Sequence, residues 1–161
     1  MKSEKKMFPL FMDLTKRRCV VIGAGKIASR RVEALLPFIG EILVIAPKAS
    51  PRILSLAGAG ALAYWEKSYE KGDLLGADLV LIATDNRAVN DEIYKDCKEL
   101  GILVNTASDQ QKCDFHFPAV IQKDSIVIGI NGGGKDHKRV KQIRQELQEF
   151  LEDLEGKEMR E

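Results

Sequence analysis

The sequence predicts an α/β fold, a doubly wound parallel sheet followed by a smaller region of two strands and one helix. Apolar segments of strand length alternate with amphipathic helical segments over residues 19–106, which predicts a parallel sheet. The strands are almost continuously apolar, as in residues 79–83, which indicates burial on both faces. After residue 110 the pattern changes to two strands around a short polar turn. We therefore expect a sheet domain at residues 1–110 and a hairpin with a C-terminal helix at residues 111–161.

The elements follow in order from the first strand, Cys19–Ile22, which runs into a glycine turn. Pro37 marks the end of the first helix, and Pro47 marks the end of the second strand. We expect helices at 29–36, 51–57 and 88–100, and strands at 41–46, 61–65, 78–83, 103–106, 117–121 and 125–130. The final helix presents one apolar face, made of Val140, Ile143, Leu147, Leu151 and Leu154. Because two strands are seldom stable alone, the second region is expected to pack on the sheet domain or to form a homodimer.

The turn after the first strand reads Gly-x-Gly-x-x-Ala over residues 23–28. Gly23 permits a tight reversal, Gly25 lets a pyrophosphate approach the backbone, and Ala28 allows close packing of helix on strand. The helix N-terminus then offers free N–H groups and partial positive charge. The pattern predicts a Rossmann-type dinucleotide-binding turn at Gly23, Gly25, Lys26 and Ile27. A tight turn without a ligand is the alternative interpretation.

Ligands of doubly wound sheets bind at the carboxyl ends of the strands. Pro47 and Lys48 follow the second strand, where a carboxylate commonly binds the adenosine ribose; its absence leaves the choice between NAD and NADP open. Thr84 and Asp85 follow the fourth strand and suit contact with the cofactor, although Asp85 could instead cap the next helix. Asn105, at the end of the fifth strand, is a further candidate for cofactor binding.

The composition limits the kinds of binding partner and the compartment that we expect for this protein. The 25 basic and 24 acidic residues give no argument for binding nucleic acid. The apolar segments are too short to span a membrane and no secretory segment begins the sequence, so we expect a cytoplasmic protein. Cys19, Cys97 and Cys113 fit free thiols in a reducing compartment. Cys113, Asp114 and His116 carry metal-binding groups but are too few for a closed site, so no bound metal is expected.

The chain contains several motifs that resemble those of the siroheme synthase family and occur in the same order. More narrowly, they resemble the precorrin-2 dehydrogenase and sirohydrochlorin ferrochelatase module of that family. The resemblance covers about residues 8 to 150. Its motifs are Phe8-Pro9-Leu10-Phe11-Met12-Asp13-Leu14, Val20 and Ile22-Gly23-Ala24-Gly25, Ala83-Thr84-Asp85, Val89-Asn90, Leu103-Val104-Asn105, Cys113-Asp114-Phe115, Phe117-Pro118-Ala119 and Gly133-Gly134-Lys135.

This resemblance implies an enzyme that uses NAD to oxidise precorrin-2 to sirohydrochlorin, a homodimer, and in some members insertion of Fe²⁺ to form siroheme. In the family pattern, Asn-Val-x-Asp ends in the proposed acid/base residue. Here Ser108 occupies that position and Asp109 follows it. Either Asp109 reaches the site through a changed turn, or dehydrogenation does not need the aspartate. Metal insertion must remove pyrrole protons, for which a placed base matters more.

The loop before the last helix departs from the family pattern, with Gly132 where relatives often have serine and His137 where they have proline. Glycine-rich loops ahead of a helix suit anions, and precorrin-2 carries many carboxylates. The substrate-binding candidates are Gly132, Gly133, Gly134, Lys135, Lys138 and Arg139. A solvated basic helix face is the alternative.

A second function also fits the dinucleotide turn. A non-enzymatic module could sense NAD(H) and dock on a partner protein through the hairpin and the basic helix. Turnover of precorrin-2 with NAD⁺ distinguishes the enzyme from the sensor.

Overall fold

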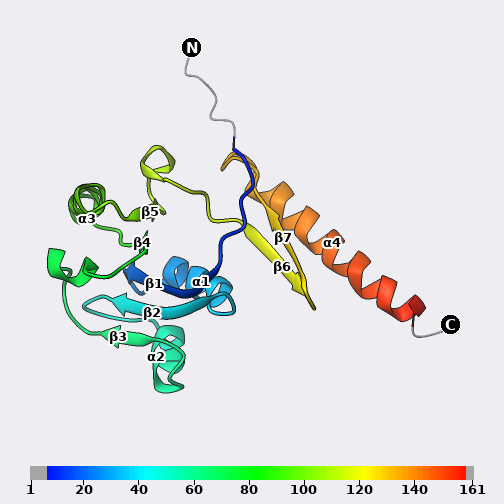
Figure 1. Ribbon diagram of the computed structural model, residues 1–161, viewed down its shortest axis with the longest axis horizontal. Helices are drawn as coiled ribbons and strands as arrows, with labels where there is room; N and C mark the ends of the chain where they lie inside the picture. Colours follow the sequence, from blue (N-terminus) through cyan, green and yellow to red (C-terminus); the bar gives the residue numbers. More distant parts are fainter. Residues whose placement is uncertain (1–6, 159–161) are drawn as a thin grey trace, which may run out of the picture. The chain divides into compact units, whose positions relative to one another are not determined.

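The computed structural model describes residues 7–158 and divides them into two compact units (Figure 1). The larger unit comprises residues 12–115. The smaller comprises residues 7–11 together with residues 116–158. Within residues 7–158, no helix combines the length and the apolar character needed to cross a membrane.

The larger unit is built on a parallel sheet of five strands in the order β3-β2-β1-β4-β5. The strands are β1 (Leu14–Ile22), β2 (Ile39–Ile45), β3 (Ala63–Trp65), β4 (Leu79–Ile82) and β5 (Leu103–Thr106). This is the order of the first five strands of a doubly wound dinucleotide-binding fold, so the predicted fold class is confirmed. Strand order reverses at β1, and ligands of such sheets bind beyond the carboxyl ends of the strands at that point.

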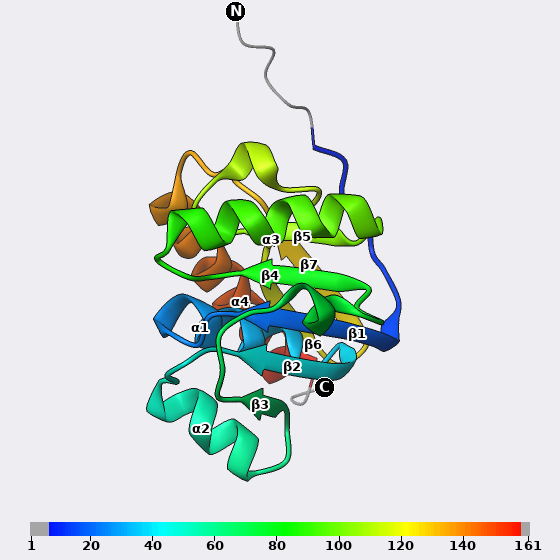
Figure 2. The same ribbon diagram turned by 90° about the vertical axis from the view of Figure 1, so that its left-hand side faces the viewer.

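Helices cover both faces of this sheet. They are α1 (Lys26–Leu35), α2 (Pro51–Gly58) and α3 (Arg87–Leu100), with 3₁₀ turns η1 (Lys71–Leu74) and η2 (Gln110–Lys112). Figure 1 shows α1 and α3 on opposite faces, and Figure 2 shows α3 lying across β4 and β5. Asn86 caps α3 by accepting a hydrogen bond from the Val89 N–H at 3.2 Å, so Asp85 is not the helix cap.

One cluster of the core lies between the sheet and α3. Strand residues such as Val20, Leu43, Val80 and Val104 are buried there. Cys97 of α3 lies in the same cluster, and burial raises its pKa to about 12, which keeps the thiol protonated at neutral pH.

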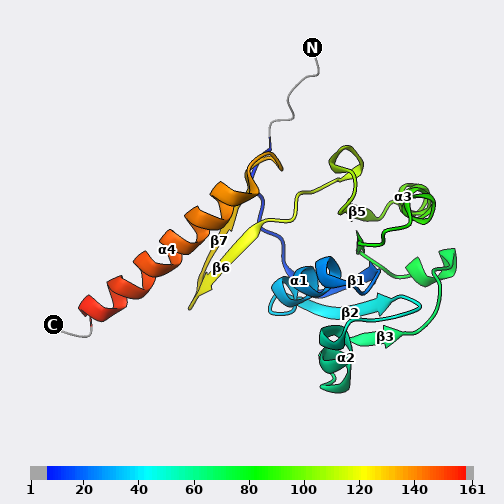
Figure 3. The ribbon, with the colours of Figure 1, turned by 180° about the vertical axis from the view of Figure 1, so that it is seen from behind.

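The smaller unit consists of an antiparallel hairpin, β6 (Ala119–Lys123) and β7 (Ile126–Ile130), and the helix α4 (His137–Glu158). Figure 3 shows α4 running beside the hairpin, and its contacts are with β6. Arg144 of α4 donates a hydrogen bond from Nε to the Val120 carbonyl at 3.1 Å. Asp124 lies in the turn between β6 and β7 and has a positive φ of 51°.

Candidate functional site

The glycine turn joins β1 to α1 and packs directly on the end of β4. Gly23 has a φ of 104°, and its N–H donates to the Ile45 carbonyl at 2.9 Å. A Cβ at Gly23 would lie 2.5 Å from the Ala83 carbonyl oxygen, well inside van der Waals contact. The turn therefore touches three strand ends at once, and only glycine fits at this position.

Gly25 is different, because the space beside it is open. It precedes α1 in an extended conformation, makes no side-chain cap, and no atom lies within 4 Å of where its Cβ would be. The first N–H groups of α1, including those of Lys26 and Ile27, lack intrahelical partners by helix geometry. An unobstructed backbone at a helix N-terminus suits a diphosphate, so the turn fits the dinucleotide that the sequence predicts.

Two serines hold the loop after β2 against this turn. Ser50 donates its N–H to the Ala24 carbonyl at 2.9 Å, and Ser29 donates its hydroxyl to the Gly25 carbonyl at 3.0 Å. The two hydroxyl oxygens are 2.9 Å apart. Sequence reasoning did not find this pair, because a serine at either position carries no motif. The loop that it fixes contains Pro47 and Lys48, both exposed.

A cavity of about 370 Å³ opens at the carboxyl ends of β4 and β5. Four predicted residues line it together: Thr84, Asp85, Ser108 and Asp109. The other lining residues, which the sequence did not assign to a site, are Arg87, Asn90, Asp91, Thr106 and Lys112.

The turn after Ser108 places Asp109 at the cavity. Its Oδ1 accepts the Gln111 N–H at 2.9 Å and so caps η2. Lys112, at the other end of η2, pairs with Asp91 of α3 at 2.5 Å and holds the pKa of that carboxyl below its usual range. The η2 turn thus begins directly after Ser108 and Asp109, and both side chains line one cavity.

Asn105 does not line the cavity. Its side chain is buried and donates from Nδ2 to the Phe115 carbonyl at 2.6 Å, which fixes the chain as it leaves the sheet. Thr106, the next residue, lines the cavity instead, because successive strand residues point to opposite faces.

The residues considered as metal ligands have other partners. The Cys113 thiol donates to the carbonyls of Thr106 and Asp109 at 3.3 and 3.4 Å, and Asp114 pairs with Lys98. His116 lies within hydrogen-bonding distance of Asn131. Among residues 7–158, no group of three or more His, Cys, Asp or Glu side chains could hold a metal ion.

The glycine loop before α4 belongs to the smaller unit. Gly133 and Gly134 have φ values of 63° and 73°, and the Asn131 carboxamide oxygen accepts the Gly133 N–H at 2.9 Å. A Cβ at Gly132 would lie 2.6 Å from a methyl carbon of Val140, so close packing on α4 accounts for the missing serine.

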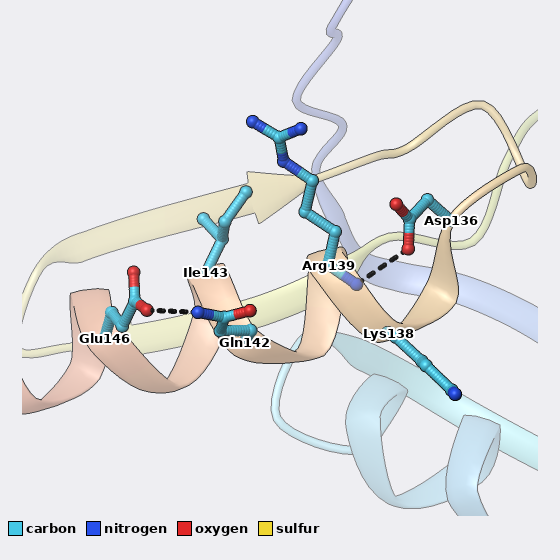
Figure 4. A pocket seen from close by; sticks show the side chains of 6 residues that line it. All are labelled: Asp136, Lys138, Arg139, Gln142, Ile143 and Glu146. Atoms are coloured by element: carbon cyan, nitrogen blue, oxygen red, sulfur yellow. Dashed lines mark hydrogen bonds between the residues drawn. The ribbon is translucent and has the colours of Figure 1, made fainter.

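A hollow runs along the start of α4 (Figure 4). Two of the predicted basic residues, Lys138 and Arg139, line it, but Figure 4 shows their side chains pointing to different sides of the helix. Asp136 accepts the Arg139 N–H at 2.8 Å and caps the helix. The remaining lining residues are Gln142, Ile143 and Glu146.

The sheet order, the glycine turn and the polar cavity define an NAD(P)-binding domain. A family model described as "Putative NAD(P)-binding" matches residues 10–119. The chain belongs to this family and, within it, to the family of the siroheme synthase N-terminal module. NAD is its cofactor.

Three relatives support membership in the siroheme synthase family. A "Probable multifunctional siroheme biosynthesis protein HemA" of Ruminiclostridium josui is 36% identical over 89% of this chain and 28% of its own. The siroheme synthase of Pseudoalteromonas atlantica is 34% identical over 89% of this chain and 31% of its own. A solved structure of SirC, a precorrin-2 dehydrogenase, is 30% identical, with a TM-score of 0.71 over 88% of this chain and 69% of that chain. The chain thus spans about a third of the length of the first two of these relatives.

Proposed function

We propose that this protein uses NAD⁺ to dehydrogenate precorrin-2 to sirohydrochlorin, a step of siroheme synthesis. One observation carries the proposal: the dinucleotide turn and the polar cavity meet at the end of β4. Gly23 packs on Ala83, and the next residue, Thr84, lines the cavity. A dinucleotide whose diphosphate lies at the turn can therefore extend its nicotinamide toward Ser108 and Asp109. Similarity to SirC supplies the substrate.

The reaction removes a hydride and a proton from the tetrapyrrole. When bound, NAD⁺ supplies the hydride acceptor. The protein holds the cofactor and the substrate in contact, which alone supplies a large share of the rate enhancement. We assign binding of the diphosphate to the turn after β1, at Gly23, Gly25, Lys26 and Ile27. Pro47 and Lys48 are assigned to the adenosine, and Thr84 and Asp85 to the part of the cofactor that extends toward the nicotinamide. Asn105 supports this site by fixing the end of β5.

Ser108 and Asp109 carry the proton chemistry in this proposal. Asp109 Oδ1 is engaged by the Gln111 N–H, and the same carboxylate lines the cavity beside Ser108. A carboxylate held by one main-chain hydrogen bond at the mouth of a polar cavity can accept a proton from bound substrate.

Replacing Asp109 by asparagine tests this role. Asn keeps an oxygen acceptor for the Gln111 N–H, so η2 keeps its cap, while the base is lost. We expect kcat for precorrin-2 oxidation to fall about 100-fold, the lower end of what a general base supplies, with little change in KM for NAD⁺. Steady-state kinetics measure this effect. Asp124→Asn, a matched change in the exposed hairpin turn, is expected to leave kcat unchanged; equal activity in both variants removes Asp109 from the catalytic residues.

The basic start of α4 is the proposed site for the substrate carboxylates. Gly132, Gly133 and Gly134 open the backbone ahead of the helix, and Lys135, Lys138 and Arg139 supply positive charge. Since Lys138 and Arg139 point to different sides of α4, the two cations suit different carboxylates of one macrocycle.

A second copy of the chain is the proposed partner of the smaller unit. Among its described residues only Ile121 falls in the buried class, at 5% exposed. Its apolar side chains remain open, including Phe8 at 84%, Phe11 at 71% and Phe150 at 58%. So much exposed apolar surface on so small a unit indicates that a partner covers it. Sedimentation equilibrium is expected to give a dimer, and a chain that stays monomeric at micromolar concentration contradicts this.

The activity test mixes the protein with precorrin-2 and NAD⁺ without oxygen and follows NADH and sirohydrochlorin together. Equal amounts of both products support the dehydrogenase. NAD⁺ binding without turnover refutes it and favours the alternative, a module that senses NAD(H) and docks on a partner. A further arm adds Fe²⁺ to sirohydrochlorin, because the Asp109 carboxylate could also accept pyrrole protons during metal insertion.

A further inference from the structure

Asn90 lies at the centre of a hydrogen-bond network that joins the two loops around the cavity. It is 5% exposed and comes from the first turns of α3. Its Nδ2 donates to the Thr84 carbonyl at 3.1 Å and to Ser108 Oγ at 3.3 Å. Its Oδ1 accepts the Thr84 hydroxyl at 2.5 Å. The side chain therefore touches the loop after β4 and the loop after β5 at the same time.

The partners determine which way the Asn90 carboxamide points. The Thr84 carbonyl can only accept, so the atom facing it must be the nitrogen. The second hydrogen of that nitrogen then points to Ser108 Oγ, which accepts it. Ser108 Oγ is also 3.0 Å from Thr106 Oγ1. Asn90 thus occupies one lone pair of the Ser108 oxygen and limits where the Ser108 proton can point.

We propose that Asn90 is a positioning residue for precorrin-2 dehydrogenation, one that holds Ser108 at a fixed place and orientation against the main chain of Thr84. The inference rests on the function proposed above. Thr84 lies on the cofactor side of the cavity and Ser108 on the proton-accepting side, so one buried amide sets the separation of the two reacting partners. A displacement of about 1 Å between such partners costs about 100-fold in rate.

Asn90→Asp tests the proposal with almost no change of volume. An ionised carboxylate cannot donate, so it repels the Thr84 carbonyl and turns the Ser108 hydroxyl toward itself. Burial raises the pKa of such a carboxyl, and a protonated carboxyl regains one donor. Five charged side chains line the same cavity as Asn90, three acidic and two basic: Asp85, Asp91, Asp109, Arg87 and Lys112.

The expected result is a ratio of variant to native kcat that changes with pH. At about pH 8 the variant's kcat is about 100-fold below that of the native protein, and at about pH 5 the deficit shrinks to about tenfold or less. KM for NAD⁺ changes less than kcat, because the glycine turn assigned to the diphosphate makes no hydrogen bond with Asn90. A residue that merely stabilised the fold would lower thermal stability without creating this pH profile.

Asn86→Asp is the matched control, since it makes the same change four residues earlier. The Asn86 side chain accepts from the Val89 N–H, which a carboxylate does equally well. Its pH profile is expected to follow that of the native protein. Identical profiles for Asn90→Asp and Asn86→Asp overturn the positioning role.

If Asn90→Asp does not fold, Asn90→Ala replaces it: its kcat should fall, and adding Asn90→Ala to Ser108→Ala should lower kcat no further, because Asn90 acts through Ser108. Multiplied losses overturn the proposal. Native protein that binds NAD⁺ but never oxidises precorrin-2 refutes the proposed function itself, and the positioning role with it, whereas native turnover with an unchanged variant refutes the positioning role alone.

Discussion

Gly23→Ala is expected to destabilise the larger unit by at least about 3 kcal/mol, a large part of the stability of a domain of this size. The new Cβ would lie 2.5 Å from the Ala83 oxygen and 2.7 Å from its carbonyl carbon, and both are backbone atoms that cannot rotate away. The φ of 104° adds strain for any residue with a Cβ. Denaturant unfolding measures the loss, and we expect NAD⁺ binding to disappear with it.

Gly60→Ala separates the clash from the backbone strain. Gly60 also has a positive φ, 73°, but nothing lies within 4 Å of its Cβ position. Its substitution should therefore cost only about 1 to 2 kcal/mol. Equal losses at Gly23 and Gly60 would contradict the close contact between the glycine turn and β4.

Gly25→Ala is expected to have the opposite profile, with folding kept and cofactor binding lost. The φ of −84° at Gly25 suits alanine, and a Cβ there meets no protein atom. Stability should change by no more than about 1 kcal/mol, the usual size of a helix-cap effect. The methyl group would occupy the path of the diphosphate, so we expect the affinity for NADH, measured by fluorescence titration, to fall about 100-fold.

Gly58→Ala provides the control for this variant. Gly58 closes α2 with open space around its Cβ position and lies outside the proposed site. Its substitution should leave NADH affinity unchanged. Native affinity in Gly25→Ala would place the dinucleotide elsewhere.

The sequence predicts most of the sheet because buried parallel strands are apolar throughout. It misses the first half of β1, whose residues 14–18 are mostly polar. That half depends on partners distant in sequence: Asp78 accepts hydrogen bonds from Arg17 Nη1 at 2.8 Å and from the Arg18 N–H at 2.9 Å. Pairing of this kind leaves no local pattern. The turns η1 and η2 are missed because short polar capping contacts close them.

The candidate site likewise has a part that the sequence predicts and a part that it does not. The glycine turn is predictable, since the constraint at Gly23 and Gly25 acts within a few residues. The roles of Asn90 and Thr106 are not predictable, because parallel pairing of β4 with β5 brings their loops together. Asn105 was expected beside the cofactor, but the alternation of side chains along β5 turns it toward Phe115.

Calorimetric titration of the native protein with NAD⁺ tests the central claim most directly, namely that the turn after β1 holds a nicotinamide dinucleotide. We predict saturable binding of one NAD⁺ per chain, weakened in Gly25→Ala. Folded protein that takes up neither NAD⁺ nor NADP⁺ would contradict the claim and the redox function that depends on it.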